Sequence, residues 1–150
     1  MANKSKFNVD MSKKGKDKRT YQGIVFDSEL EFKVYTKYLL PLKESGVVKN
    51  ITLQPKFELQ PKFTKNGKNI RPINYVADFE IEYSNGQIEV WDVKGMALSD
   101  AKIKRKLFDY VYPDKILRWV AISMIDGGLC DVETIEKGRK ERKKAKLANK

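Results

Sequence analysis

The chain has 150 residues and a formal net charge of +11, from 31 Lys and Arg against 20 Asp and Glu. It contains no histidine and one cysteine, Cys130, which excludes Ser-His-Asp and Cys-His catalysis, an intramolecular disulfide framework and a cysteine-rich zinc site. Any catalysis must therefore use carboxylates and lysine. No apolar run is long enough to span a membrane, and the first residues lack the apolar centre of a signal peptide, so we expect a soluble intracellular protein.

The positive charge lies at the two ends of the chain. Residues 1–20 carry +5 and residues 137–150 carry +7, which leaves the middle near −1. A near-neutral centre between basic ends is typical of a protein that follows a polyphosphate backbone, although two solvated tails would give the same pattern. The length fits one folded domain. We expect a basic flexible arm over 1–20, a domain over 21–131 and a basic helix or tail over 132–150.

The first predicted element is a helix that follows Phe26. Asp27 or Ser28 is the expected N-cap. Pro41 should end or kink the helix, and the Ser-Gly pair at 45–46 should close it. Its apolar residues recur at helical spacing and give one stripe that faces a core. The stripe consists of Leu30, Val34, Tyr35, Tyr38, Leu39 and Leu42.

Extended chain follows. Residues 47–63 are rich in β-branched and aromatic side chains, while their two prolines favour the edge of a sheet or a linker. Residues 64–72 (TKNGKNIRP) predict a basic turn. Two strong strands are predicted over 75–83 and 88–94, and the Ser-Asn-Gly sequence at 84–86 between them is a hairpin signal.

The loop of this hairpin decides whether Asp78 and Asp92 lie together. A two-residue Asn85-Gly86 loop would pair Asp78 with Val93 and send Asp92 to the opposite face of the sheet. A three-residue loop, with Gly86 in a left-handed bulge, would instead pair Asp78 with Asp92. Glycine at the third loop position favours the second arrangement, so we expect the two carboxylates side by side.

A helix and a strand complete the predicted core. The helix is basic, with Ser99 or Asp100 as its cap, and should run to about Tyr112 and stop at Pro113. The apolar run at 116–123 predicts a strand that is buried on both faces. The order of all these elements predicts an α/β fold in which helices flank a mixed β-sheet.

Two aspartates beside a lysine suggest chemistry on a phosphodiester. The carboxylates of Asp78 and Asp92 would repel each other unless they share a cation, and hard oxygen ligands favour Mg²⁺ or Mn²⁺. Such a metal lowers the pKa of an attacking water and stabilises the negative charge of the transition state. Lys94 follows Asp92 by two residues, hence on the same face, where it can position the water or meet the negative charge.

The pattern Asp78 followed by Asp92-x-Lys94 resembles the PD-(D/E)xK nuclease superfamily, with Ala77 in place of the usual proline. Over residues 25–123 the chain also resembles phage endonuclease I-type Holliday junction resolvases and a group of phage proteins assigned to the same superfamily. The shared features are Ser-x-x-Glu at 28–31, Tyr-x-x-Asp-Phe at 75–79, an Asn-Gly turn, an acidic-x-Lys-Gly strand end at 92–95, and a basic helix followed by a proline and a strand. Asp92 stands where the resolvases usually have glutamate.

The resemblance implies a restriction-endonuclease-like fold and a metal-dependent active site. Glu31, Asp78 and Asp92 would be catalytic metal ligands, with Val93 as a further metal-binding position. Lys94 would be the catalytic lysine. The resemblance also implies two Mg²⁺ (or Mn²⁺) ions per site, no small-molecule cofactor, and a homodimer that acts on DNA, expected to be branched, in a phage-infected bacterial cell.

Each of these residues also has a plainer structural interpretation. Glu31 could complete a capping box with the N-cap serine, and Asp78 could simply initiate a strand. Asp92 and Lys94 could form a cross-strand ion pair. The basic helix could contact phosphates or present a solvated face to water. Its candidate nucleic-acid-binding residues are Lys102, Lys104, Arg105 and Lys106.

The sequence therefore predicts a Mg²⁺-dependent, structure-selective DNA endonuclease of the Holliday junction resolvase kind. A restriction-like or transposon-end nicking nuclease is an alternative within the same class. A non-catalytic DNA-binding module is an alternative from a different class. Metal dependence of cleavage separates this module from the nucleases, and the preferred shape of the DNA separates the two nucleases.

Overall fold

The computed structural model describes residues 9–93 and 98–150. The chain divides into two compact units, Met1–Val47 and Val48–Lys150, and this boundary falls inside the single domain expected over 21–131. None of the helices in the described part of the chain is long and apolar enough to cross a membrane.

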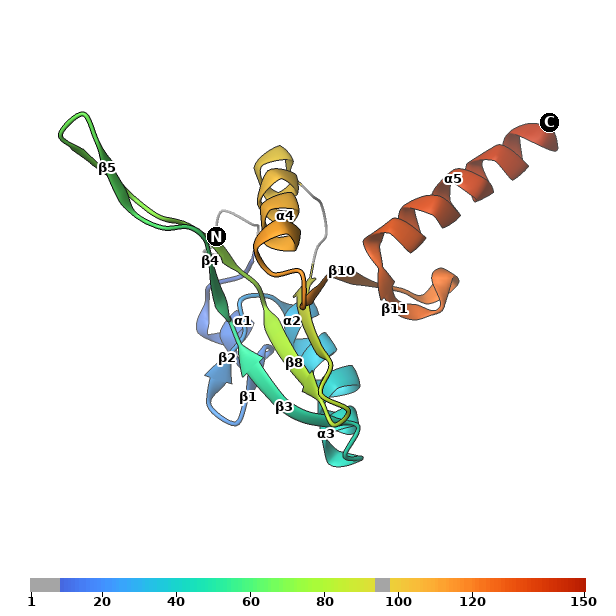
Figure 1. Ribbon diagram of the computed structural model, residues 1–150. Helices are drawn as coiled ribbons and strands as arrows, with labels where there is room; N and C mark the ends of the chain where they lie inside the picture. The colour runs from blue at the N-terminus through green and yellow to red at the C-terminus, as the bar shows by residue number, and fades with distance from the viewer. Residues whose placement is uncertain (1–8, 94–97) are drawn as a thin grey trace. The chain divides into compact units, whose positions relative to one another are not determined.

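Short elements build the first unit (Figure 1). They are α1 (Lys13–Asp17), β1 (Thr20–Tyr21), β2 (Ile24–Val25), α2 (Glu29–Val34), the π-helical turn η1 (Tyr35–Leu39) and α3 (Leu40–Glu44). The strands β1 and β2 pair antiparallel. Aromatic rings gather beside them: the ring centroid of Phe26 lies 5.1 Å from that of Tyr35 and 6.0 Å from that of Phe32.

Arg19 organises the start of this unit. It is only 2 % exposed, its Nε donates to the carbonyl of Phe26 at 2.7 Å, and its Nη1 donates to the carbonyl of Asp10 at 2.6 Å. Residues 9–20, part of the expected flexible arm, thus contain the helix α1 and a buried arginine. The physical reason is that one basic residue of this stretch satisfies buried backbone carbonyls instead of standing in water.

The predicted helix after Phe26 forms as three consecutive helical segments. Ser28 is its N-cap, as expected. Pro41 has no N–H to donate, and its ring excludes a regular α-helical turn before it. The chain widens there into the π-helical turn η1, in which the N–H of Leu40 reaches the carbonyl of Tyr35. Gly46, with φ of +82°, ends the helix.

A five-stranded mixed sheet is the centre of the second unit. Its order is β11 (Gly128–Asp131), β10 (Ile116–Ser123), β9 (Ile88–Val93), β8 (Phe79–Tyr83) and β3 (Val48–Leu53). The central neighbours β9 and β10 run parallel, and all other neighbours run antiparallel. This confirms the α/β architecture expected of a restriction-endonuclease-like fold, with β3 at the sheet edge. The short strand β11 was not predicted.

Helix α4 (Ser99–Val111) connects the parallel strands and packs on one face of the sheet. Its N-cap position is Leu98, one residue before the first of the two expected caps, and the helix begins at Ser99. Phe108 is fully buried at the centre of the hydrophobic core. The other buried members of this core are Phe57, Leu59, Tyr75, Ala77, Val90 and Leu117.

A two-stranded ribbon extends away from the sheet (Figure 1). In its first half β4 (Lys56–Gln60) pairs with β7 (Ile73–Val76), and in its second half β5 (Phe63–Lys65) pairs with β6 (Lys68–Ile70). Residues 64–72 are thus most of a hairpin and not only a basic turn. Asn66 and Gly67 close it with φ values of 52° and 72°, as a two-residue loop with left-handed residues requires.

The C-terminal helix α5 (Val132–Ala148) begins at the predicted residue and is held as far as Arg142. Arg142 donates two hydrogen bonds, of 2.7 and 3.2 Å, to Asp126 at the end of the 3₁₀ turn η2 (Met124–Asp126). Gly138 lies so close to this carboxylate that a Cβ on it would come within 2.4 Å of Oδ1. Ile135 is buried, whereas the helix beyond Arg142 is exposed.

Candidate active site at the ends of strands β8 and β9

The register of the β8–β9 hairpin brings Asp78 and Asp92 to the same end of the sheet. Phe79 pairs with Trp91, and the next positions outward along the two strands are 78 and 92. The two strands therefore have the predicted register, and their pairing ends at Phe79 and Trp91. Asp92 ends up 5 % exposed, and Asp78 is half-buried.

The loop of this hairpin has three residues, as the glycine predicted. The N–H of Gly86 donates to the carbonyl of Tyr83 at 2.9 Å, and the N–H of Tyr83 donates to the carbonyl of Gln87 at 2.9 Å. Gly86 has φ of +90°, a conformation in which side chains with a Cβ are strained. This glycine thus fixes the register on which the position of Asp92 depends.

Asp78 lies where the chain passes from the ribbon to the sheet. The predicted strand 75–83 is interrupted at this point, because Ala77 still donates to the carbonyl of Pro55 at 3.1 Å whereas Asp78 donates to that of Trp91 at 3.1 Å. The carbonyl of Asp78 accepts from the N–H of Gln54 at 2.9 Å. Gln54 has φ of +48°, so backbone strain is held beside this aspartate.

The side chain of Asp78 closes over the end of β9. Its Oδ2 accepts a hydrogen bond of 2.7 Å from the N–H of Val93. This bond fixes the orientation of one carboxylate against the backbone next to the other. The side chain of Asp78 is thus held in one orientation, which an aspartate that only begins a strand does not require.

Asp92 is held by a buried pair of aromatic side chains. The hydroxyl of Tyr75 donates to Oδ2 of Asp92 at 2.5 Å, and Nε1 of Trp119 donates to the Tyr75 hydroxyl at 3.0 Å. Burial raises the pKa of the Tyr75 phenol far above its ordinary value, and the charges of Asp92 and Asp78 raise it further. Tyr75 therefore stays protonated and remains a donor.

The sequence analysis gave no site role to Tyr75 or Trp119 and so missed their polar role. Both are buried, but their polar atoms form the support of Asp92. For Tyr75 a signal existed, because it stands three residues before Asp78 in the Tyr-x-x-Asp-Phe pattern. Trp119 gave no local signal: its place comes from the parallel pairing of β10 with β9, in which it lies opposite Asp92.

Glu31 belongs to the first unit, and the other two carboxylates belong to the second. The N–H of Glu31 donates to Oγ of Ser28 at 3.1 Å, and this hydroxyl donates to Oε1 of Glu31 at 3.1 Å. Glu31 thus takes part in N-capping, which was its structural alternative. Lys94 lies outside the described residues. In the part of the chain that the structure describes, no group of three Asp, Glu, Cys or His side chains is placed to hold a metal ion.

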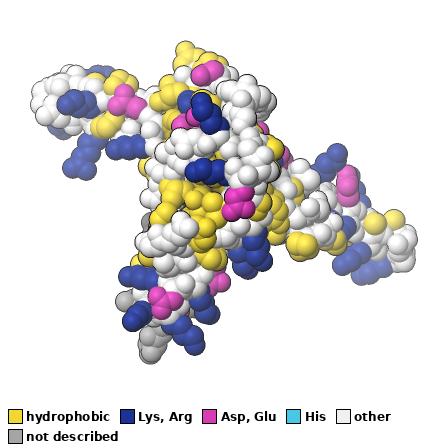
Figure 2. Space-filling view, turned by 90° about the horizontal axis from the view of Figure 1, so that it is seen from below, with side chains coloured by type: hydrophobic (Ala, Val, Ile, Leu, Met, Phe, Trp, Pro, Cys, Tyr) yellow, Lys and Arg dark blue, Asp and Glu magenta, His cyan; other side chains and the backbone are white. Residues whose placement is uncertain are grey.

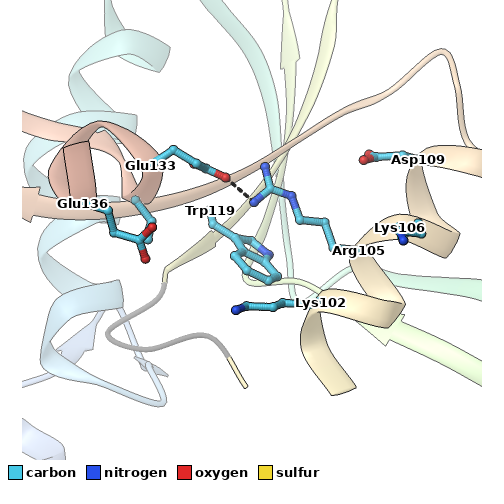
Figure 3. A pocket seen from close by; sticks show the side chains of 8 residues that line it. Lys102, Arg105, Lys106, Asp109, Trp119, Glu133 and Glu136 are labelled. Carbon is cyan, nitrogen blue, oxygen red and sulfur yellow. Dashed lines mark hydrogen bonds and ion pairs between the residues drawn. The ribbon is translucent and has the colours of Figure 1, made fainter. Parts of the chain in front are cut away.

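Basic residues of α4 line a pocket of about 380 Å³ on the same face of the sheet as Asp92 (Figure 3). Arg105 lies over the ring of Trp119, 4.6 Å from its centroid, and donates to Glu133 of α5 at 2.5 Å. Trp119, which donates a hydrogen bond to Tyr75, therefore also lines this pocket. Its lining residues are Lys102, Arg105, Lys106, Asp109, Trp119, Val132, Glu133 and Glu136.

The charges in this pocket are balanced. Three cations face three carboxylates, so the pocket alone does not present a strongly positive surface. Lys102 and Lys106 are exposed, Lys104 is half-buried outside the pocket lining, and Arg105 is paired with Glu133. Phosphate contact by these four residues stays a prediction, with Lys102 and Lys106 the best placed to make it.

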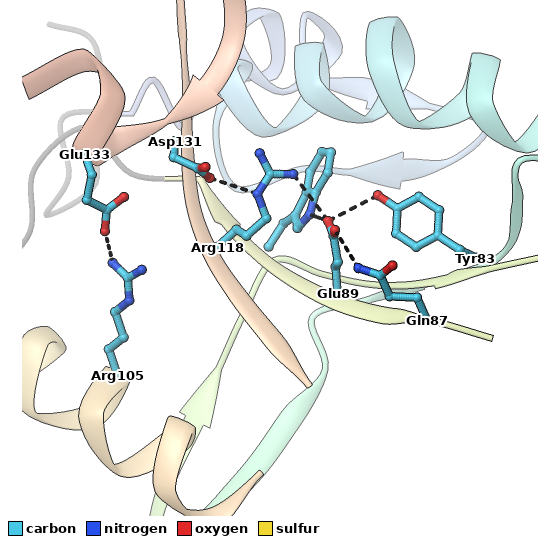
Figure 4. A network of polar contacts seen from close by, with 8 residues as sticks. Tyr83, Gln87, Glu89, Arg105, Arg118, Asp131 and Glu133 are labelled. Atoms are coloured by element: carbon cyan, nitrogen blue, oxygen red, sulfur yellow. Dashed lines mark hydrogen bonds and ion pairs between the residues drawn. The ribbon is translucent and has the colours of Figure 1, made fainter. Parts of the chain in front are cut away.

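A polar network braces the opposite face of the sheet (Figure 4). Glu89 accepts hydrogen bonds from Nε1 of Trp91 at 2.7 Å, the hydroxyl of Tyr83 at 3.2 Å and Nη1 of Arg118 at 3.3 Å. Arg118 also donates to Asp131 of β11 at 2.8 Å. Burial and then Glu89 raise the pKa of Tyr83 to about 12. These bonds connect β8, β9, β10 and β11 and stabilise β9 on the face of the sheet opposite Asp92.

The second unit is thus a mixed α/β protein with a supported pair of aspartates at one end of its central strands. Residues 11–125 match the model of a family described as "Protein of unknown function (DUF1064)". The match covers most of the chain, and the protein belongs to this family. Comparison with curated proteins and with solved structures gives no match.

Proposed function

We propose that this protein is a metal-dependent DNA endonuclease of the PD-(D/E)xK type, with Asp78, Asp92 and Lys94 at its active site. The observation that carries the proposal is the register of the β8–β9 hairpin, which sets Asp78 and Asp92 at the same strand ends, with Asp92 held by the Tyr75 hydroxyl and Asp78 by the Val93 N–H. Metal-dependent phosphodiester hydrolysis of this type uses two carboxylates at strand ends and a lysine. Here the lysine, Lys94, follows Asp92 by two residues.

The donor atoms fit Mg²⁺ or Mn²⁺. The carboxylates of Asp78 and Asp92 and the carbonyl of Val93 are hard oxygen ligands, and Mg²⁺ in nucleotide-processing sites is commonly held by one or two carboxylates together with water and substrate phosphates. Glu31 is the further ligand that the resemblance implies. A bound metal would supply Lewis acidity, which lowers the pKa of water and stabilises charge on the phosphate.

The chain's own residues orient this site. The Tyr75 hydroxyl fixes one oxygen of Asp92, and the Val93 N–H fixes one oxygen of Asp78. Trp119 holds Tyr75 in turn. Lys94 contributes the positive charge that positions a water or meets the negative phosphate. Such a fixed arrangement of donors lowers the reorganisation needed when charge develops.

DNA is the proposed substrate because the chain is strongly basic at both ends, and two aspartates with a lysine are residues that metal-dependent phosphodiester hydrolysis uses. A four-way junction contains two symmetry-related strands to cut, and a two-fold homodimer with one site per subunit would match it. Preference for branched DNA is the narrower part of the proposal and rests on the resemblance to resolvases.

The test is cleavage of an end-labelled four-way junction beside a linear duplex of the same sequence, with Mg²⁺ or with EDTA. We expect paired nicks in the junction with Mg²⁺ and none with EDTA. Cleavage of linear duplex at the same rate would replace the resolvase by a nuclease of other specificity. Absence of metal-dependent cleavage on both substrates would remove the nuclease proposal and leave a DNA-binding module.

A further inference from the structure

We infer that the β5–β6 hairpin, residues 61–72, is a basic ribbon that binds in the major groove of duplex DNA. The hairpin projects from the sheet as the far half of the ribbon (Figure 1), and Figure 2 shows Lys and Arg side chains along this arm. The inference rests on the proposed function for the choice of DNA over other polyanions.

The first observation is charge. The segment contains four cations and no carboxylate, namely Lys62, Lys65, Lys68 and Arg71. Lys65 and Lys68 are direct cross-strand partners, and the same register continues to positions 62 and 71. Like charges directly opposite each other destabilise a β-ribbon. None of the four makes an ion pair with any residue that the structure describes.

The second observation is exposure. Every residue of 61–72 is exposed, including Phe63 at 44 % and its cross-strand partner Ile70 at 38 %. An isolated two-stranded hairpin is only marginally stable in water. An exposed ribbon that pairs like charges and leaves two large apolar side chains in water gains stability from a partner that supplies negative charge and apolar contact.

The third observation is anchorage. The β5–β6 pairing continues the register of Gln60 with Ile73 in the β4–β7 half, whose Phe57 and Tyr75 are buried in the core under α4. The far half extends about 20 Å beyond that pair, at about 3.3 Å per residue. It is therefore an extension of a strand pair fixed in the core, and not a free loop.

Shape and chemistry favour the major groove. That groove is about 12 Å wide, admits a two-stranded β-ribbon and displays the thymine methyl groups, whereas the minor groove is about 6 Å wide and displays none. One face of the hairpin carries Phe63 and Ile70, which can contact thymine methyl groups. The other carries Thr64 and Asn69, which hydrogen-bond each other at 2.9 Å and can reach base edges. Lys65 and Lys68 share the face of Phe63 and Ile70, the cations at 62 and 71 share the other face, and all four would contact phosphates.

The experiment compares two variants with equal loss of charge. The ribbon variant replaces the four hairpin cations with glutamine. The control variant replaces four exposed lysines outside the ribbon and the basic ends with glutamine, namely Lys33, Lys37, Lys43 and Lys49. Binding to a fluorescein-labelled 16-base-pair duplex is measured by anisotropy in EDTA at several salt concentrations, and circular dichroism checks that both variants are folded.

We expect the ribbon variant to bind more weakly and its slope of log affinity against log salt to fall by about 3 to 4, because each phosphate contact contributes about 0.9. The control should lose less than about one. Methyl green, which occupies the major groove, should displace the wild-type protein, and distamycin, which occupies the minor groove, should not. Equal slopes for the two variants, or displacement by distamycin alone, would overturn the inference.

These results are separable from the proposed function. If DNA binding depends on the ribbon but no metal-dependent cleavage occurs, the nuclease proposal is contradicted and the ribbon inference is supported. Metal-dependent cleavage, together with an unchanged salt slope in the ribbon variant, would support the nuclease and overturn the ribbon inference.

Discussion

Tyr75 donates a hydrogen bond of 2.5 Å to Asp92 from a strand that belongs to a different sheet. Tyr75 lies in β7 of the ribbon, and Asp92 lies in β9 of the five-stranded sheet. The bond therefore joins the ribbon to the strand that carries the candidate site. Both residues are buried, so the energy of this contact is not screened by water.

We expect Tyr75→Phe to lower the free energy of unfolding by about 2 kcal/mol or more, because the buried Asp92 carboxylate and the Trp119 N–H each lose a partner. Urea denaturation measures it. Tyr83→Phe is the matched control: Glu89 keeps its bonds from Trp91 and Arg118, so the loss should be about 0.5–1.5 kcal/mol. An equal loss in both variants would show that the Tyr75–Asp92 bond has no special weight.

Asp78→Ala, Asp92→Ala and Lys94→Ala should each reduce cleavage by at least about a hundredfold while binding to DNA is largely kept, because a metal ligand or a catalytic cation acts on the chemical step. Single-turnover cleavage and anisotropy measure the two effects. Glu80→Ala is the control, since Glu80 lies two residues from Asp78 but pairs with Lys115 at 3.0 Å. Wild-type cleavage by purified Asp92→Ala would refute the assignment.

Gly86→Val should destabilise the protein by about 1 kcal/mol or more and reduce cleavage, since a β-branched residue is strained at φ of +90°. Space is not the cause, because a Cβ there meets no described atom within 4 Å. Gly86→Asn should be better tolerated, since asparagine enters the left-handed region at lower cost. Thermal melts compare the three proteins. Equal melting of Gly86→Val and wild type would mean that the loop does not depend on this conformation.

The junction between η2 and α5 should depend on pH. The hydrogen bonds from Arg142, and then that from Ser123, lower the pKa of Asp126 below its usual 3.8 in the folded protein. Its contribution to stability is therefore present above pH 3.8 and is lost as the pH falls through the lowered pKa. Asp126→Asn should be less stable than wild type at pH 7, and the difference in urea denaturation should shrink near pH 3. A difference that does not change with pH would contradict this.

Local signals were sufficient for elements whose partners are close in sequence. Ser28 as N-cap, the three-residue loop closed by Gly86, and the strand Ile116–Ser123 were all predicted from side-chain chemistry and spacing. The turn at Asn66-Gly67 carried an equally good signal, but the flanking residues are too polar to look like strands. In the structure they are strands without a buried face.

Features that depend on distant partners could not be predicted. The alternation of Tyr75, Ala77, Phe79 and Ile81 looks like one continuous strand, yet the chain changes partner between Ala77 and Phe79. The use of Arg19 as an internal donor depends on carbonyls at Asp10 and Phe26 that composition does not reveal.

Pro61 and Pro72 stand at the base of the exposed hairpin, one on each strand, and neither has an N–H for the strand ladder. Backbone pairing is therefore interrupted at one level on both strands, between Gln60 with Ile73 and Phe63 with Ile70. Residues 61–72 can be exchanged as a cassette without changing a buried residue. A chimaera with a hairpin of different length or charge should keep the core and alter only which nucleic acid the protein binds.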